Sequence, residues 1–214
     1  MKKTFVAAMM MILGAAVFAQ TGVIKELAGT VELKRSGAAA FTPARAGDTV
    51  AKDTIVSTGF KSSAIITVGS SVITVRPLTS LSFSDISAQA GTETLNVNLQ
   101  AGRVRVDVSP PVGTRARMSV QGPSATASVR GTSFEFDTSN LQVLEGTVAF
   151  EGNRGETVLV RAGSTSRIDA DGRVVHPLIT NAEKLYPLAE TDSGKSTDAL
   201  PPSMVDISIS LSYL

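Results

Sequence analysis

Pairs of arginines are the residues of this sequence most suited to binding chemistry. Arg103 and Arg105 are two residues apart in an alternating stretch, and so are Arg115 and Arg117. Because successive side chains of a strand point to opposite faces, each pair shares one face. If the two strands were neighbours, four guanidinium groups would line one surface and could bind acidic glycan, lipid headgroups or an acidic protein. The alternative is a solvated face on which Asp107 and nearby acids pair with the arginines.

A further arginine, Arg130, stands in the tripeptide Arg130-Gly131-Thr132 before the alternating stretch TSFEFD. Its guanidinium could meet an anionic ligand or the carboxylate of a partner. In the structural alternative, which we favour, Gly131 permits a sharp turn while Arg130 and Thr132 satisfy backbone carbonyls or a neighbouring Asp.

Other ionisable residues favour turns over metal or catalytic sites. Asp48 and Asp53 flank one turn, and Asp169 and Asp171 lie in another. Oxygen ligands suit calcium, but these spacings do not supply the ligands of an EF-hand loop. The single histidine, His176, has no Gly-x-Ser-x-Gly elbow to serve. We therefore expect no catalytic residue, no metal and no cofactor.

Composition narrows the function classes further. The 214 residues include 20 Lys and Arg against 19 Asp and Glu, so bulk charge does not predict nucleic-acid binding. The absence of Cys excludes disulfides, thiol nucleophiles, Cys-ligated zinc and iron–sulfur clusters. Trp is absent and aromatic residues are 5%, so stacking platforms for bases or sugars would be sparse.

Alternating apolar and polar residues predict an all-β fold of many short strands from about residue 22 to 178. The clearest runs are TVELKR, AIITVG, SVITVR, LSFSDI, TLNVNLQ, GRVRVDV, TSFEFD, LQVLE and TVAFEG. Glu145-Gly146 and Asp171-Gly172 predict tight hairpins. Gly-Thr-Val or Gly-Arg-Val recurs at 29–31, 102–104, 146–148 and 172–174, which indicates a repeated glycine turn that starts a strand.

The two ends of the chain have different patterns. Lys2 and Lys3, the apolar run 5–17 and Ala19 are typical of a secretory signal peptide cut before Gln20. The alternative, a signal anchor, is less favoured because that run is shorter than the roughly 20 residues of a membrane span. We predict a signal peptide at 1–19, an all-β domain at 20–179, a short helix at 180–189 opened by a capping box of Thr180 and Glu183, a linker at 190–203 and a C-terminal strand at 204–214. That strand could pair with its own sheet, which we favour, or with another chain, including a second copy of this one.

Six phrases in order resemble the FecR domain, the extracytoplasmic module of iron-transport signalling regulators: 29–37, 47–83, 95–108, 128–137, 143–152 and 158–168. The most specific are Val129-Arg130-Gly131-Thr132, followed by an aromatic strand, and Gly47-Asp48 leading to Ser57-Thr58-Gly59. The resemblance implies an all-β, solenoid-like fold, although periodicity alone does not choose a solenoid over a sandwich. It implies structural roles for the motif residues Gly47, Asp48, Gly59, Val129, Gly131 and Thr132.

The sequence departs from those regulators at its N-terminus. They carry a cytoplasmic helical region that holds a sigma factor, followed by a membrane span, and neither is expected here. We therefore expect a non-enzymatic exported module of the bacterial cell envelope, in the periplasm or at the cell surface. It would recognise a protein partner through strand edges and through Arg103, Arg105, Arg115, Arg117 and Arg130. A glycan- or surface-binding structural protein is the main alternative, and an enzyme is the least favoured.

Overall fold

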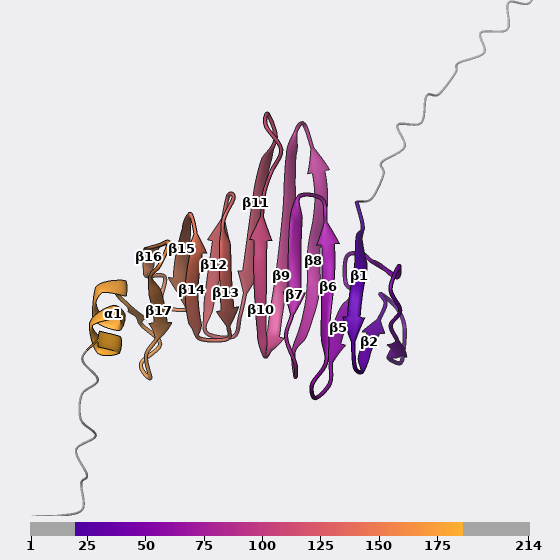
Figure 1. Cartoon of the computed structure of the whole chain (residues 1–214), viewed down its shortest axis with the longest axis horizontal. Coiled ribbons are helices and arrows are strands. Elements are labelled where there is room, and N and C mark those ends of the chain that lie inside the picture. The colour runs from indigo at the N-terminus through magenta and orange to yellow at the C-terminus, as the bar shows by residue number, and fades with distance from the viewer. Residues whose placement is uncertain (1–19, 186–214) are drawn as a thin grey trace, which may run out of the picture.

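The computed structural model describes residues 20–185, and they form two nine-stranded β-sheets that pack face to face (Figure 1). The first sheet has the order β18 (Val174–Val175), β17 (Thr165–Ile168), β14 (Asn140–Glu145), β13 (Ser133–Asp137), β10 (Arg103–Val108), β7 (Ser71–Val75), β6 (Ser63–Val68), β1 (Gly22–Ala28) and β4 (Thr49–Val50). The second has the order β16 (Thr157–Arg161), β15 (Thr147–Gly152), β12 (Ala125–Val129), β11 (Arg115–Gln121), β9 (Thr92–Ala101), β8 (Ser80–Gln89), β5 (Ile55–Thr58), β2 (Val31–Lys34) and β3 (Thr42–Pro43). The predicted all-β class is confirmed.

The chain advances along both sheets at once. It crosses repeatedly from one sheet to the other, so the strands follow each other in nearly sequential order along the long axis, as the colour gradient of Figure 1 shows. Neighbouring strands are antiparallel except β9 and β11, which are parallel. The fold therefore combines a two-sheet sandwich with the steady advance of a solenoid.

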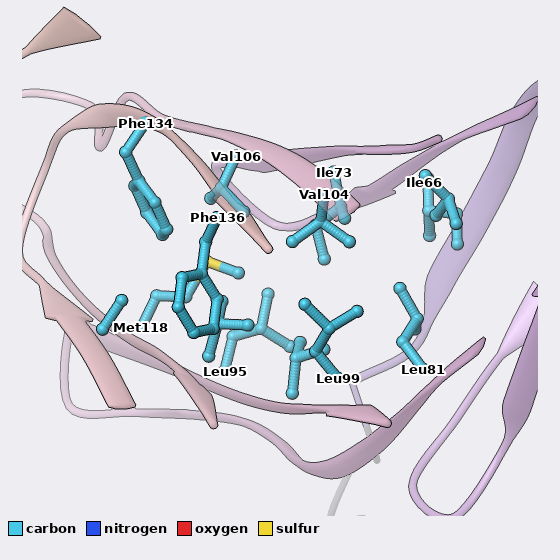
Figure 2. Close-up of a cluster of buried hydrophobic side chains, with 14 of the residues drawn as sticks. Ile66, Ile73, Leu81, Leu95, Leu99, Val104, Val106, Met118, Phe134 and Phe136 are labelled. Atoms are coloured by element: carbon cyan, nitrogen blue, oxygen red, sulfur yellow. The ribbon is translucent and has the colours of Figure 1, made fainter. Parts of the chain in front are cut away.

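The core lies between the sheets because each strand turns one face inward. In Figure 2, side chains of the first sheet point toward side chains of the second, and both sets are buried. The labelled residues are Ile66, Ile73, Val104, Val106, Phe134 and Phe136 opposite Leu81, Leu95, Leu99 and Met118. The alternation that predicted the strands thus also identifies their buried faces.

Three of the four recurring Gly-x-Val sequences mark places where the chain changes sheet. Gly29, Gly102 and Gly146 lie between β1 and β2, β9 and β10, and β14 and β15, and each has a positive φ. The predicted hairpin at 145–146 is therefore wrong, because β14 and β15 belong to different sheets. The turn here sends the chain across the core.

The fourth recurrence is a hairpin, as predicted. Gly172 lies in the loop between β17 and β18, which pair antiparallel. The Gly172 N–H donates to the carbonyl of Asp169 at 3.0 Å, and the Asp169 carboxylate accepts from the N–H of Asp171 at 3.0 Å. Asp169 therefore organises a turn.

The helix α1 (Pro177–Leu185) begins earlier than the expected 180–189. His176 precedes it, and its Nδ1 accepts from the N–H of Leu178 at 3.3 Å. Thr180 is buried inside the helix, and its Oγ1 has no partner among the described residues, so the capping box expected there is wrong. Pro177 suits a first helical position because its missing N–H needs no partner there.

The expected signal peptide at 1–19, linker at 190–203 and strand at 204–214 lie outside the described residues, as do residues 186–189 of the expected helix. Within residues 20–185, no helix has the length and apolar character needed to cross a membrane.

Candidate functional site

The structure separates the arginines that the sequence suggested might form one stripe. β10 carries Arg103 and Arg105 in the first sheet, between β7 and β13. β11 carries Arg115 and Arg117 in the second sheet, between β9 and β12. Since buried residues alternate with these arginines on both strands, each pair faces outward from its own sheet. The four guanidinium groups therefore lie on opposite faces of the sandwich.

Carboxylates pair with both arginines of β10. Arg103 Nη2 lies 3.4 Å from Asp137 Oδ2. Arg105 donates to Asp107 through Nε at 3.1 Å and through Nη2 at 3.3 Å. This face corresponds to the charge-paired alternative, and its arginines have less capacity to bind an external anion.

Two aspartates on this face have pKa values below the usual 3.8. Burial raises the pKa of Asp107, but hydrogen bonds from Arg105 and Ser133 outweigh it. Burial likewise raises the pKa of Asp137, and it is outweighed by the N–H groups of Ser139 at 3.0 Å and Asn140 at 2.7 Å, by the Asn140 side chain and by the charge of Arg103. Both groups are therefore held in the charged form.

The Asp137 carboxylate should make the free energy of unfolding depend on pH in the acidic range. Its pKa is lower in the folded chain, so its contribution is present above the unfolded value near 3.8 and is lost as pH falls through the folded value. We expect Asp137→Asn to lower the free energy of unfolding by about 1 kcal/mol at pH 7. Urea titrations between pH 7 and pH 2 should show this difference shrinking in acid, and a difference that stays constant would contradict the assignment.

The second sheet carries an arginine pair that is arranged differently. Met118 and Val129 are paired across β11 and β12, and both point into the core. Arg117 precedes Met118 on β11, and Arg130 directly follows the last residue of β12; both side chains are exposed. Two strands thus bring two guanidinium groups to one place on the outer face.

Arg117 and Arg130 line an open trough of about 540 Å³ on this face. Small side chains form its floor at facing positions of three strands: Ser119 is opposite Ser128, and Ser128 is opposite Ala149. Leu159 of β16, opposite Ala149, forms an apolar rim and is 63% exposed.

The trough is polar on the side of β9 and positively charged at the arginines. Ser119 Oγ donates to Asn96 Oδ1 at 2.8 Å, which fixes one amide at the edge of the trough. Within residues 20–185, neither Arg117 nor Arg130 forms an ion pair with a carboxylate. Two unpaired like charges that line one trough repel each other, and an anion bound between them would offset that repulsion. The arrangement can therefore bind a carboxylate or a similar anion.

Arg115 lies on the same strand and outer face as Arg117, opposite Thr92 of β9, but it does not line the trough. The pairing of Arg117 with Arg130 could have been found from the dipeptide Gly122-Pro123, a turn signal midway between them. In the structure this turn is closed by the N–H of Gly122, which donates to the Ala125 carbonyl at 2.8 Å. Leu159 had no comparable local signal, because β16 reaches the trough through β15.

The motif residues around Arg130 lie where β12 gives way to β13 in the other sheet. Gly131 has φ +126°, in the region that favours glycine. Val129 and Thr132 are buried, and the Thr132 carbonyl accepts from the N–H of Val108 at 3.0 Å. These three residues shape the crossing, and Arg130 is the member with an exposed side chain.

The other motif lies in the turns around β4 and β5. Asp48 accepts from the N–H of Arg45 at 2.8 Å and lies 3.3 Å from Arg35, while Gly47 has φ +91°. The Gly59 N–H donates to the Thr30 carbonyl at 2.9 Å. These contacts are structural, and no group of three or more metal-ligating side chains occurs in the part of the chain that the structure describes.

Comparison with known proteins gives one family. The model of the FecR protein family matches residues 54–149. Two crystal structures of a candidate anti-sigma factor from Parabacteroides distasonis ATCC 8503 are similar in fold: one is 13% identical with a TM-score of 0.47 and the other 12% with 0.46, covering 60% and 61% of this chain. This chain spans 63% of the length of each, and no curated protein matches it.

Proposed function

We propose, from the premise that this chain carries a FecR domain at residues 54–149, that it is a non-enzymatic binding module for an acidic segment of a partner protein. A FecR domain belongs to signalling regulators and is a module of regulation rather than of catalysis.

One observation carries this proposal: Arg117 and Arg130 face the same trough without a carboxylate partner in residues 20–185. The first sheet provides the contrast, because Arg103 and Arg105 are both held by aspartates. A free guanidinium offers a planar fork of N–H donors that fits a carboxylate with two hydrogen bonds.

The rest of the trough favours an extended peptide. Its floor of small side chains leaves room for a backbone, and the exposed Leu159 offers an apolar contact beside the charges. In an extended segment, an acidic side chain and an apolar side chain two residues apart lie on the same face. The acidic one could bind the arginines while the apolar one contacts Leu159. The polar edge at Thr94 and Asn96 keeps the alternative open, which is glycan or cell-surface binding.

The proposal includes the cell envelope as the place of action. The pattern at residues 1–19 supports export to the periplasm or the cell surface. The partner is then an envelope protein with an exposed acidic segment. No nucleic acid, metal or cofactor is invoked.

Charge reversal in the trough should abolish capture of the partner. We expect the double variant Arg117→Glu/Arg130→Glu to recover at least tenfold less partner in a crosslinked pull-down from the native cell envelope, quantified by mass spectrometry. Each lost charge-assisted hydrogen bond is worth about 1.5–3 kcal/mol, and about 1.4 kcal/mol is a factor of ten. The reversed charges would also repel the acidic segment.

The matched control is Arg154→Glu/Arg173→Glu, which changes the net charge equally on two exposed arginines outside the trough. It should capture the partner like the unmodified chain. Equal recovery by both double variants would overturn the proposed site. If instead the unmodified chain sediments with purified cell-wall material and the trough variant does not, the glycan-binding alternative is correct.

A further inference from the structure

The four sheet edges of the described chain differ in how well they resist pairing with another strand. β3, β4 and β18 have two residues each, and β3 contains Pro43. β16 has five residues and no proline. Short strands and proline are the usual protection of a sheet edge, so β16 is the edge best suited to accept another strand.

Hydrogen bonds at both ends of β16 identify which of its backbone N–H and carbonyl groups point away from β15. The Glu156 carbonyl accepts from the N–H of Gly152 at 3.0 Å, and the Ala162 N–H donates to the Gly146 carbonyl at 2.9 Å. In an antiparallel pair, alternate residues bond to the same neighbour. Thr157, Leu159 and Arg161 therefore direct their N–H and carbonyl groups away from β15, toward the open edge.

The core is also incompletely covered at this end. Val160 is fully buried, whereas Val158, the other inward residue of β16, is only partly buried. Ile168 and Val174, near the facing edge of the first sheet, are partly buried against the core. A strand added beside β16 with apolar side chains turned inward would cover these residues.

The chain itself contains a segment with that pattern. In residues 204–214, Val205, Ile207, Ile209 and Leu211 alternate with Asp206, Ser208, Ser210 and Ser212. Residues 186–203 connect it to α1, which packs against β17 at the same end of the sandwich (Figure 1). Eighteen residues reach at most about 60 Å when extended, so the edge is within range.

We propose that residues 204–214 add to the free edge of β16 as a tenth strand of the second sheet. The apolar residues of this segment face the core, and the serines continue the polar outer face beside Leu159. A tether within the same chain gives an effective concentration of order millimolar, which favours this occupant over a second copy at ordinary protein concentration. This inference rests on the free edge of β16, and not on the arginines of the trough or on the partner proposed for them.

The absence of cysteine makes a direct test possible. In the chain from Gln20 to Leu214, Leu159→Cys is combined in turn with Ser208→Cys, Ser210→Cys and Ser212→Cys. Outward residues on neighbouring strands have Cα atoms about 5.5 Å apart, a separation that a disulfide spans. We expect one of these three pairs to form an intramolecular disulfide in at least tenfold higher yield than the controls.

The controls are Leu159→Cys with Ile209→Cys, which reverses the face, and with Ser193→Cys in the connecting segment. Mass spectrometry after mild oxidation distinguishes a bridge within one chain from a bridge between two. Equal yields for all pairs, or a product of dimer mass, would overturn the proposal.

A second measurement avoids substitutions in the strand. Hydrogen exchange of the unmodified chain is compared with that of a chain ending at Ser203. We expect the amides of Thr157, Leu159 and Arg161 to exchange at least tenfold more slowly in the unmodified chain, because the added strand would accept their N–H groups. Exchange at the same rate in both chains would contradict strand addition.

Discussion

Gly102→Ala is expected to destabilise the fold by roughly 2–5 kcal/mol. Gly102 lies where the chain leaves β9 for β10, with φ +88°. A Cβ atom there would overlap with Thr79 Oγ1, and it would lie 2.5 Å from Thr79 Cα and 2.7 Å from the Leu78 carbonyl oxygen. The cost combines about 1–2 kcal/mol for a left-handed alanine with about 1–3 kcal/mol for overpacking.

Thr79 cannot easily move to make room for that atom. Its Oγ1 accepts from the N–H of Arg103 at 3.0 Å, and its own N–H donates to Thr58 Oγ1 at 3.0 Å. Thr58 Oγ1 in turn donates to the Arg76 carbonyl at 2.7 Å. Any shift of Thr79 therefore strains contacts in both sheets, which is why we expect the upper part of the range.

Gly113→Ala provides the matched control for this variant. Gly113 has nearly the same conformation, φ +86°, but nothing lies within 4 Å of the added Cβ. It should lose only about 1–2 kcal/mol, the backbone part of the cost. Urea unfolding followed by circular dichroism suits a chain without tryptophan. Equal losses of unfolding free energy at the two positions would show that Thr79 moves aside for the added Cβ atom at little cost.

Local sequence patterns predicted the strands but, apart from the hairpin at Gly172, not which strands are neighbours. Alternation fixes which face of a strand is buried, and it did so correctly for β10 and β13. A glycine between two alternating runs has the same sequence pattern whether the two strands pair with each other or enter different sheets. Gly146 therefore looked like a hairpin, and only the pairing of β14 with β13 and of β15 with β12 makes it a crossing.

The same limitation explains the candidate site. A period of two places Arg103 and Arg105 on one face, but it does not say that this strand and the one bearing Arg117 enter different sheets. The sequence also does not distinguish an arginine that pairs with a carboxylate in the fold from one that does not. The Asp137 that pairs with Arg103 comes from β13, a strand brought alongside by tertiary structure.

Phe136→Ala is expected to lower the free energy of unfolding by about 3–5 kcal/mol, the usual cost of removing a buried aromatic ring. Phe136 is fully buried on β13 of the first sheet. Its ring meets Phe150 of the second sheet edge to face, with centroids 6.0 Å apart and planes at 76°. It also reaches the turn at Gly122, where an added Cβ would lie 3.1 Å from its Cζ. One ring therefore fills the space between the sheets, and its loss leaves a cavity.

Phe60→Ala separates this packing effect from the loss of any phenylalanine. Phe60 is 74% exposed between β5 and β6, where Lys61 Nζ lies 5.6 Å from its ring centroid. An exposed cation–π contact contributes about 0.5–1 kcal/mol, so this variant should lose no more than that. Chemical denaturation of both variants at 25 °C measures the difference. If Phe136→Ala also lost less than about 1 kcal/mol, the sheets would be held together mainly by other contacts, and the aromatic pair would contribute little.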